Sequence, residues 1–418
     1  MGPERTAGGA DTRTDAINWP VVVLTFATLV VIYGVWYSFS VFLVALVRHF
    51  GWSRALVSGA FSSFVLLHGM LGPIVGWLAR RYEPRLLFLT GGMLIPIGLL
   101  LTAEATAWWQ LYIAYSGITA IGISLAGWVP CVIFIQGWCP RRFATAMGVA
   151  SAGIGVGMLA LVPLTQVVIQ QSGWPWALRM QAFLAAAWLI PAGCWWIRNP
   201  PGFGRTAGEE RQRTDTPRHW TLPLALRSWR FWGVAAGYFT GNAVTQMLVI
   251  HQVAYLVDHG MPVMAAATVG GIVGLATIGA KVGWGVLSDR AGREITAGLA
   301  FGLVCLSVAV LVLAGQYPES WVPYLYAVLI AFGYGVLSPV FPAIAGDLFA
   351  GPGFSTIYGT LYGVICLGLA AGPWAAGKIF DATGSYGAAL WAGLALAAVT
   401  PGLLWLAAPR RPNPVPER

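Results

Sequence analysis

The chain has 418 residues, of which 9% are charged and 57% are hydrophobic. A soluble globular protein has roughly 25% charged residues, so this chain has too few to cover a surface that faces water. Its five cysteines show neither paired nor metal-ligand spacing, and we expect no disulfide, metal or cofactor. The composition indicates a helical membrane protein and excludes a secreted enzyme, a nucleic-acid-binding protein and a disordered chain.

Apolar stretches long enough to cross a bilayer, about 20 residues each, follow one another along most of the chain. We predict an all-α membrane protein with twelve transmembrane helices in two six-helix pseudo-symmetric halves. The predicted spans are 20–46, 55–79, 85–103, 107–136, 144–170, 174–197, 231–257, 262–287, 295–315, 321–345, 355–379 and 386–408. The predicted organisation is a tail at 1–17, halves at 18–198 and 230–408, a polar linker at 199–229 and a second tail at 409–418.

The net charge of +9 reflects 24 basic against 15 acidic residues, and the positions of the basic residues indicate membrane topology and not a nucleic-acid partner. With the N-terminus inside, all of them fall on the cytoplasmic side except Arg48, Arg54, Arg179, Lys378 and the intramembrane Lys281. The positive-inside rule therefore places both termini in the cytoplasm. We expect a multi-pass protein of the bacterial plasma membrane, that is, the inner membrane. We also expect a monomer without a nucleic-acid partner.

The two halves share a short loop pattern. Residues 76–85 (GWLARRYEPR) follow the second span, and residues 285–294 (GVLSDRAGRE) follow the eighth span 209 residues later. Two repeated six-helix units that bind a substrate between them are the architecture of one large class of transporters.

Residues 285–294 resemble the cytoplasmic loop motif of the major facilitator superfamily, Gly-x-Leu-x-Asp-Arg-x-Gly-Arg, although Glu294 stands where a basic residue usually follows. The glycines permit a tight turn, and Asp289 can pair with an arginine or a helix N-terminus. The first copy departs further, because Arg80 occupies the Asp position and Glu83 the second Gly position. We expect Asp289 and Arg290 to close the cytoplasmic side through contacts within their own half. The predicted gating residues are Asp289, Arg290, Arg293, Arg81 and Arg85.

Three further stretches are similar to the bacterial monocarboxylate porters and the oxalate/formate exchangers of that superfamily: 50–55 (FGWSRA), 251–260 (HQVAYLVDHG) and 333–335 (GYG). This resemblance implies secondary transport of a small organic anion by alternating access. It also implies that the chain is not an enzyme.

Lys281 is the one formal charge that lies inside a predicted span away from the membrane surface, because Arg85, Arg179 and Lys378 stand near span ends. Such a charge costs roughly 2.5 to 3.5 kcal/mol at a helix centre, so a water-filled cavity or an anionic ligand must offset it. It stands three residues before Trp284-Gly285, where the resembling exchangers carry a substrate-binding arginine. The alternative is that the lysine extends along the helix toward Asp289 and the membrane surface.

Acidic residues are missing from the predicted membrane interior. The eukaryotic-type monocarboxylate porters carry an Asp where this chain has Thr277, and their first-span lysine aligns with Tyr37. The stretch 358–365 (YGTLYGVI) lacks the second cation of the oxalate exchangers. One cation suits one carboxylate, since a second negative charge would be buried without a partner.

Polar and aromatic residues at depth complete the predicted substrate site. They are Trp128, Tyr33, Tyr37, Tyr334, Tyr362, Asn242 and Gln246. The alternative for each aromatic residue is helix packing, and the alternative for the two amides is a hydrogen bond to a neighbouring helix. His251 and His68 are the candidates for proton coupling, and the alternative for each is an imidazole satisfied by a backbone carbonyl. We favour a proton that, where one moves, travels on the substrate.

The predicted function is secondary transport of small organic anions, monocarboxylates in particular, as a symporter or antiporter. The alternatives are an organic-anion exchanger without proton coupling, a same-superfamily exporter of drugs or other metabolites, and a sensor that kept the fold without transport. An exporter of cations would favour an intramembrane carboxylate, and the short tails leave little room for a signalling domain.

Overall fold

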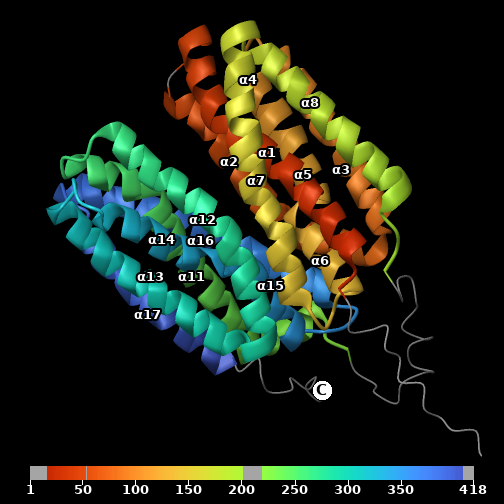
Figure 1. The fold of residues 1–418 in the computed structure, drawn as a ribbon. Coiled ribbons are helices and arrows are strands. Elements are labelled where there is room, and N and C mark those ends of the chain that lie inside the picture. Colours follow the sequence, from red (N-terminus) through yellow and green to blue (C-terminus); the bar gives the residue numbers. More distant parts are fainter. Residues whose placement is uncertain (1–16, 53, 201–218, 408–418) are drawn as a thin grey trace, which may run out of the picture.

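The computed structural model describes residues 17–52, 54–200 and 219–407, and these residues form helices joined by short turns (Figure 1). The predicted tails and most of the predicted linker lie outside the described residues. The first part of the chain forms α1 (Trp19–Phe50), α2 (Arg54–Arg81), α3 (Pro84–Ala103), α4 (Trp108–Leu111), the π-helical η2 (Tyr112–Thr119), α5 (Ala120–Ala126), α6 (Trp128–Trp138), α7 (Phe143–Ser172), α8 (Trp174–Pro191) and the π-helical η3 (Ala192–Trp196). The second part forms α10 (Leu222–Arg227), α11 (Trp229–Asp258), α12 (Val263–Ala291), α13 (Arg293–Gln316), α14 (Val322–Gly335), α15 (Leu337–Leu348), α16 (Phe354–Thr383) and α17 (Gly387–Ala407).

Each predicted span corresponds to one helix or to a run of consecutive helical segments. Within the described residues, 11 helices are long and apolar enough to cross a membrane. The helix that fails this test is α11, which has 30 residues but carries Asn242, Gln246 and His251 in its middle. The predicted span at 231–257, which brings the number of spans to twelve, is therefore supported by the length of α11 and not by its composition.

Glycines with positive φ end several helices where the chain must turn sharply. Gly51 caps α1 with φ 66°, and Gly292 joins α12 to α13 with φ 96°. Positive φ strains any residue with a Cβ atom, so the second glycine of the 285–294 loop is required by the backbone. In the first copy, Glu83 has φ −58° and is followed by Pro84, so that loop turns without a glycine.

The helices form two groups that lie side by side in Figure 1, α1 to α8 in red to yellow-green and α11 to α17 in green to blue. They meet along two helix pairs, α7 with α12 and α2 with α16, which we call the α7–α12 seam and the α2–α16 seam. Close backbone approach forms both seams. A methyl group added at Gly285 would lie 2.5 Å from the carbonyl oxygen of Ala144, and one added at Gly72 would lie 2.5 Å from that of Gly359.

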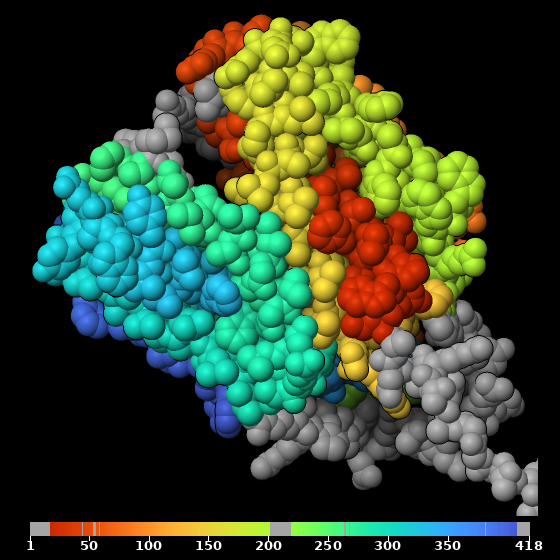
Figure 2. All heavy atoms as spheres, in the orientation of Figure 1, coloured from red at the N-terminus to blue at the C-terminus, as the bar shows by residue number. Residues whose placement is uncertain are grey.

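The two groups are in contact where α7 and α16 begin, which we call the closed end. Figure 2 shows a hollow between the groups toward the opposite end. Two helices are interrupted in corresponding positions: α5 stops at Gly127 before α6, and α14 is separated from α15 at Val336, 209 residues later. The same offset separates the two loop copies, and interrupted helices in both halves are typical of transporter substrate sites.

Candidate functional site

The helix interruption at Gly127 places Trp128 at the start of α6. Its indole Nε1 donates a hydrogen bond to the hydroxyl of Tyr358 on α16, 2.9 Å away. Trp128 is thus buried in a contact between the two groups, and a tryptophan with a satisfied N–H can still present its ring to a ligand.

Lys281 is buried near the middle of α12, with 4% of its surface exposed. Its backbone packs against Gly335, which immediately precedes the interruption between α14 and α15. The Nζ atom donates one hydrogen bond, to the carbonyl oxygen of Ser151 on α7 at 3.3 Å. In the part of the chain that the structure describes, no carboxylate lies within ion-pair distance of this ammonium group. One long hydrogen bond compensates a buried ammonium group poorly, so a nearby counter-charge would stabilise it.

The direction of the Lys281 side chain bears on the alternative of extension toward the surface. Along the seam, Ala144 faces Gly285 and Gly148 faces Lys281, so α7 and α12 run antiparallel. Ser151 lies further from the closed end than Gly148 does. The ammonium group therefore extends away from Asp289 and toward the middle of the molecule, as side chains on a helix tilt toward its N-terminus.

Four of the predicted tyrosines form two pairs that join the groups. The side chain of Tyr33 on α1 interacts with that of Tyr362 on α16. The side chain of Tyr37 interacts with that of Tyr334 on α14, directly beside the glycine that packs on Lys281. The rings of Tyr33 and Tyr37 are 6.2 Å apart between centroids. The structure thus brings these tyrosines into one cluster, next to the segment that carries the buried cation.

His68 on α2 joins the same cluster. Its Nε2 lies 3.1 Å from the hydroxyl of Tyr362, and its Nδ1 lies 2.8 Å from the hydroxyl of Ser124 on α5. The indole of Trp36 meets the imidazole edge-on at 5.1 Å between centroids. The imidazole is 3% exposed and is the one described histidine ring that hydrogen-bonds directly to a cluster tyrosine.

His251 lies elsewhere. Its Nε2 is 3.0 Å from the carbonyl oxygen of Pro373, and its Nδ1 is 3.1 Å from the hydroxyl of Tyr386 in the loop before α17. The carbonyl can only accept, so Nε2 is the protonated nitrogen of this ring. That arrangement matches the alternative of a structurally satisfied imidazole.

The structure does not join Asn242 and Gln246 to the tyrosine cluster. The amide of Asn242 donates to the carbonyl of Tyr238 one turn earlier on α11, at 2.8 Å. Gln246 is half-buried, and the described residues give it no hydrogen-bond partner. These two residues remain predicted members of the site.

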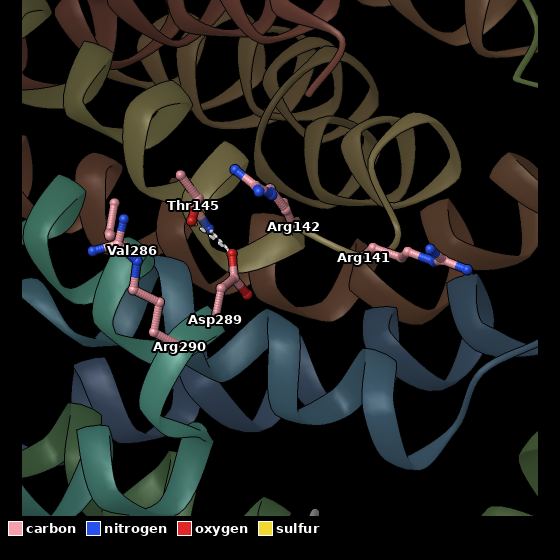
Figure 3. Close-up of a pocket in the computed structure, with 6 residues that line it drawn as sticks. All are labelled: Arg141, Arg142, Thr145, Val286, Asp289 and Arg290. Carbon is pink, nitrogen blue, oxygen red and sulfur yellow. Dashed lines mark hydrogen bonds between the residues drawn. The ribbon is translucent and has the colours of Figure 1, made fainter. Parts of the chain in front are cut away.

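Asp289 makes the contact that closes the α7–α12 seam (Figure 3). One carboxylate oxygen accepts hydrogen bonds from the backbone N–H and the hydroxyl of Thr145, at 2.8 and 2.6 Å. Thr145 is in the first turn of α7, whose N-cap residue, Arg142, offers no acceptor. Asp289 therefore caps α7 from the other group and favourably meets its dipole. The expectation of contacts within one half was incomplete, because this contact crosses between the groups.

The remaining predicted gating residues differ in their contacts. Arg293 donates to the second oxygen of Asp289 at 2.5 Å and to Asp347 at 2.9 Å, which fixes the carboxylate in place. Arg290 lines a cavity of about 370 Å³ at the closed end, with Arg141, Arg142 and Thr145. Arg81 lies over the ring of Trp77 on its own helix, and Arg85 is exposed.

The family model described as Major Facilitator Superfamily matches residues 24–373 and 282–418. The chain belongs to the Major Facilitator Superfamily.

Individual relatives agree with this family. The chain is 27% identical over 413 residues to monocarboxylate transporter 13 of Bos taurus, covering 94% of this chain and 91% of the relative. It is 25% identical to the oxalate:formate antiporter of Oxalobacter formigenes over 334 residues, covering 79% and 78%. Its fold matches that of a proton:xylose symporter with a TM-score of 0.76 and 14% identity, covering 94% and 96%. The predicted resemblance is confirmed: this is a multi-pass membrane transporter and not an enzyme.

For this Major Facilitator Superfamily member, sequence reasoning missed the partners of the predicted residues. Ser151, Ser124, Tyr358 and Thr145 contact Lys281, His68, Trp128 and Asp289 respectively. None of them is charged, and small hydroxyl residues are common in membrane helices. The repeat offered a signal for Thr145, because Phe143-Ala-Thr opens one helix and Phe354-Ser-Thr another.

Proposed function

We propose that this transporter carries small organic anions, monocarboxylates in particular, across the plasma membrane (the inner membrane of a bacterium) by alternating access. Lys281 is the anion-binding cation. The observation that carries the proposal is its isolation: a buried ammonium group whose side chain points toward the middle of the molecule, with no described carboxylate as a counter-ion.

Preference for a monocarboxylate follows from the rest of the site. The other predicted site residues bear tyrosine hydroxyls, a tryptophan N–H and an imidazole, which can donate hydrogen bonds but supply no second fixed charge. A hydroxyl cluster stabilises one carboxylate beside one lysine, whereas a dicarboxylate would leave a charge poorly compensated. The names of the related monocarboxylate transporters and of the oxalate:formate antiporter point to the same class of anion.

The transport cycle in this proposal is a rocking of two six-helix, pseudo-symmetric halves whose termini are cytoplasmic. The closed end is then the cytoplasmic side, with Asp289 holding α7 and α12 together, and the hollow opens outward. Rocking breaks the contact of Asp289 with Thr145 and exposes Lys281 to the cytoplasm.

The test is uptake into proteoliposomes of a panel of labelled anions: formate, L-lactate and pyruvate against oxalate and succinate. We expect saturable uptake of at least one monocarboxylate and at least about tenfold slower uptake of the dicarboxylates, a difference of about 1.4 kcal/mol. Protein-free liposomes report passive entry of the acids. Equal rates for both classes would contradict the single-cation argument, and no uptake of any carboxylate would contradict the proposed function.

A further inference from the structure

The hydrogen-bond directions around His68 are fixed by a neighbouring residue. Ser124 has one hydroxyl proton, and it donates that proton to the carbonyl oxygen of Ala120 at 2.8 Å. Its oxygen therefore accepts from the Nδ1–H of His68, and a neutral His68 carries no proton on Nε2. The hydroxyl of Tyr362 must donate to that nitrogen. In the neutral state, the proton of Tyr362 is thus held by an imidazole of the opposite group.

Among the residues that the structure describes, no carboxylate is in contact with His68 to compete for its proton. The elements packed around His68 present Trp36 from α1, Phe64 from its own helix, Ser124 from α5 and Tyr362 from α16. The titratable groups next to Tyr362 are Tyr33, Tyr358, Cys366 and, through Tyr33, Cys131, all of which are ordinarily uncharged at pH 7. Among the described residues, the formal charge of the central region is that of Lys281.

We propose that His68 is the residue that couples proton binding to carboxylate binding, through reversal of its hydrogen bond with Tyr362. This inference rests on the proposed function and assigns its coupling site. It differs from the expectation that any proton travels on the substrate.

The exchange of donors is simple to follow. A proton that binds Nε2 of His68 turns this nitrogen into a donor, so the oxygen of Tyr362 must accept from it. The O–H of Tyr362 then turns away from the imidazole. It donates either to the carboxylate directly or to Tyr33, whose own hydroxyl is released as a donor. No covalent bond other than N–H is formed, and the proton leaves again when the carboxylate does.

This reversal makes the two binding events favour each other. A carboxylate gains a hydrogen-bond donor only when His68 is protonated, and by reciprocity a bound carboxylate raises the affinity of His68 for a proton. The charge balance agrees, since an empty site with Lys281 carries one positive charge and a site loaded with one anion and one proton carries the same. An imidazole is suited to this role because it can gain or lose a proton while keeping its place, and a bound anion nearby favours the protonated form.

The main experiment separates driven accumulation from exchange in proteoliposomes, with L-lactate as the probe, or whichever monocarboxylate of the panel is taken up best. An inward proton gradient of one pH unit should drive wild-type accumulation of about tenfold, the ratio that corresponds to 1.4 kcal/mol. His68→Gln should still exchange labelled for unlabelled anion. It should not accumulate the anion, so the ratio of inside to outside concentration should stay at about one, because the glutamine amide donates a hydrogen bond without titrating. His251→Gln is the matched control and should accumulate as wild type does.

Exchange by His68→Gln also shows that the variant is folded. Tenfold accumulation by this variant, above that of protein-free liposomes, would overturn the inference and show that the substrate carries the proton. If His68→Gln accumulates the anion but wild-type uptake still depends on Lys281, the proposed function stands and only the coupling site is wrong. Absence of carboxylate uptake by the wild type would instead overturn the proposed function.

A second measurement does not need a membrane. When the same anion is added to purified protein in weak buffer above pH 7, the protein should take up nearly one proton per bound carboxylate. A pH-indicator dye measures the resulting rise in solution pH. Tyr362→Phe keeps the imidazole of His68 but removes the O–H whose direction depends on the protonation state of that imidazole. This variant should therefore bind the anion without proton uptake. If His68→Gln loses anion exchange as well, the proton-uptake measurement still tests whether His68 couples proton binding to carboxylate binding. Proton uptake by Tyr362→Phe equal to that of wild type would overturn the coupling route.

Discussion

The α7–α12 and α2–α16 seams are built on the same backbone contact but carry different chemistry. In each, a loop-motif glycine packs on the first turn of a helix from the other group: Gly285 on Thr145 and Gly76 on Thr356, where an added methyl would lie 3.0 Å from each Cα. One turn further along stands Asp289 in the first case and Arg80 in the second. Asp289 caps α7, whereas the hydroxyl of Thr356 has no hydrogen-bond partner among the described residues.

The difference extends to the middle of the molecule. The α7–α12 seam holds the buried Lys281, and the α2–α16 seam holds the neutral pair of His68 and Tyr362. In the mechanism we propose, one seam supplies fixed charge for binding and closure, and the other supplies a group that changes charge. Close packing belongs to both seams, and the predictions below test which differences matter.

Removal of the fixed charge should have the largest effect. Lys281→Gln should lower monocarboxylate uptake at least about 100-fold, because a hydrogen bond to a charged group contributes up to about 3 kcal/mol and more in a dry site. Lys281→Arg should keep part of the activity, since the charge remains while its geometry changes. Lys378→Gln, the same substitution on an exposed lysine of α16, is the control. Wild-type uptake by a stably expressed Lys281→Gln would contradict the division.

A methyl group in the seam should come next. Gly285→Ala places a Cβ atom 2.5 Å from the carbonyl oxygen of Ala144, and overpacking of this kind costs about 1 to 3 kcal/mol. We expect a drop in transport rate of about tenfold and a lower midpoint of thermal unfolding. Gly279→Ala on the same helix meets nothing within 4 Å and should behave as wild type. Equal effects of the two substitutions would show that close approach at the seam is not required.

Loss of the cap on α7 should have a smaller effect. Asp289→Asn removes the charge but keeps an acceptor, and a charge-assisted hydrogen bond exceeds a neutral one by about 1 kcal/mol. The population open on the cytoplasmic side should rise about fivefold, measured from spin-label distances between cysteines at Glu83 and Ile295 in an otherwise cysteine-free protein. Arg81→Gln should leave the distances unchanged, because Arg81 contacts Trp77 on its own helix. An unchanged distribution in Asp289→Asn would rule out this role.

The smallest effect is expected from making the two seams alike. Arg80→Asp places a carboxylate one turn after Gly76, where it can accept from the first turn of α16 and from Thr356. An added N-cap contributes about 1 kcal/mol, so the closed population should rise about two- to fivefold and turnover should slow accordingly. The same spin-label pair measures it. Faster turnover in Arg80→Asp would mean that the seams do not correspond as described.

Much of the fold was predictable from the sequence because a membrane helix needs a continuous apolar run of known length. The spans, the repeated loop and the isolation of Lys281 all follow from positions of charge along the chain. The composition of α11 was misjudged, because a helix between packed neighbours tolerates amides and a histidine that a lipid-facing helix would not.

The site itself was predictable as a set of residue types but not as a network. Tyr33 and Tyr362 are far apart in sequence, and so are His68 and Ser124, so their pairing depends on how the groups pack. Both histidines fit the same description at the sequence level, an imidazole within a span. Their contacts distinguish them, since His251 donates to a backbone carbonyl while His68 accepts from a tyrosine of the other group.

The most direct test of the central claim compares a carboxylate with its uncharged amide. Affinities of the purified protein for L-lactate and lactamide, measured by calorimetry at pH 6, report how much of the binding depends on the substrate's charge. The account predicts that wild type prefers lactate by at least about 100-fold, some 2.7 kcal/mol, and that Lys281→Gln loses this preference while Lys378→Gln keeps it. A Lys281→Gln protein that still prefers lactate to the same degree would contradict the assignment of Lys281 as the anion-binding cation.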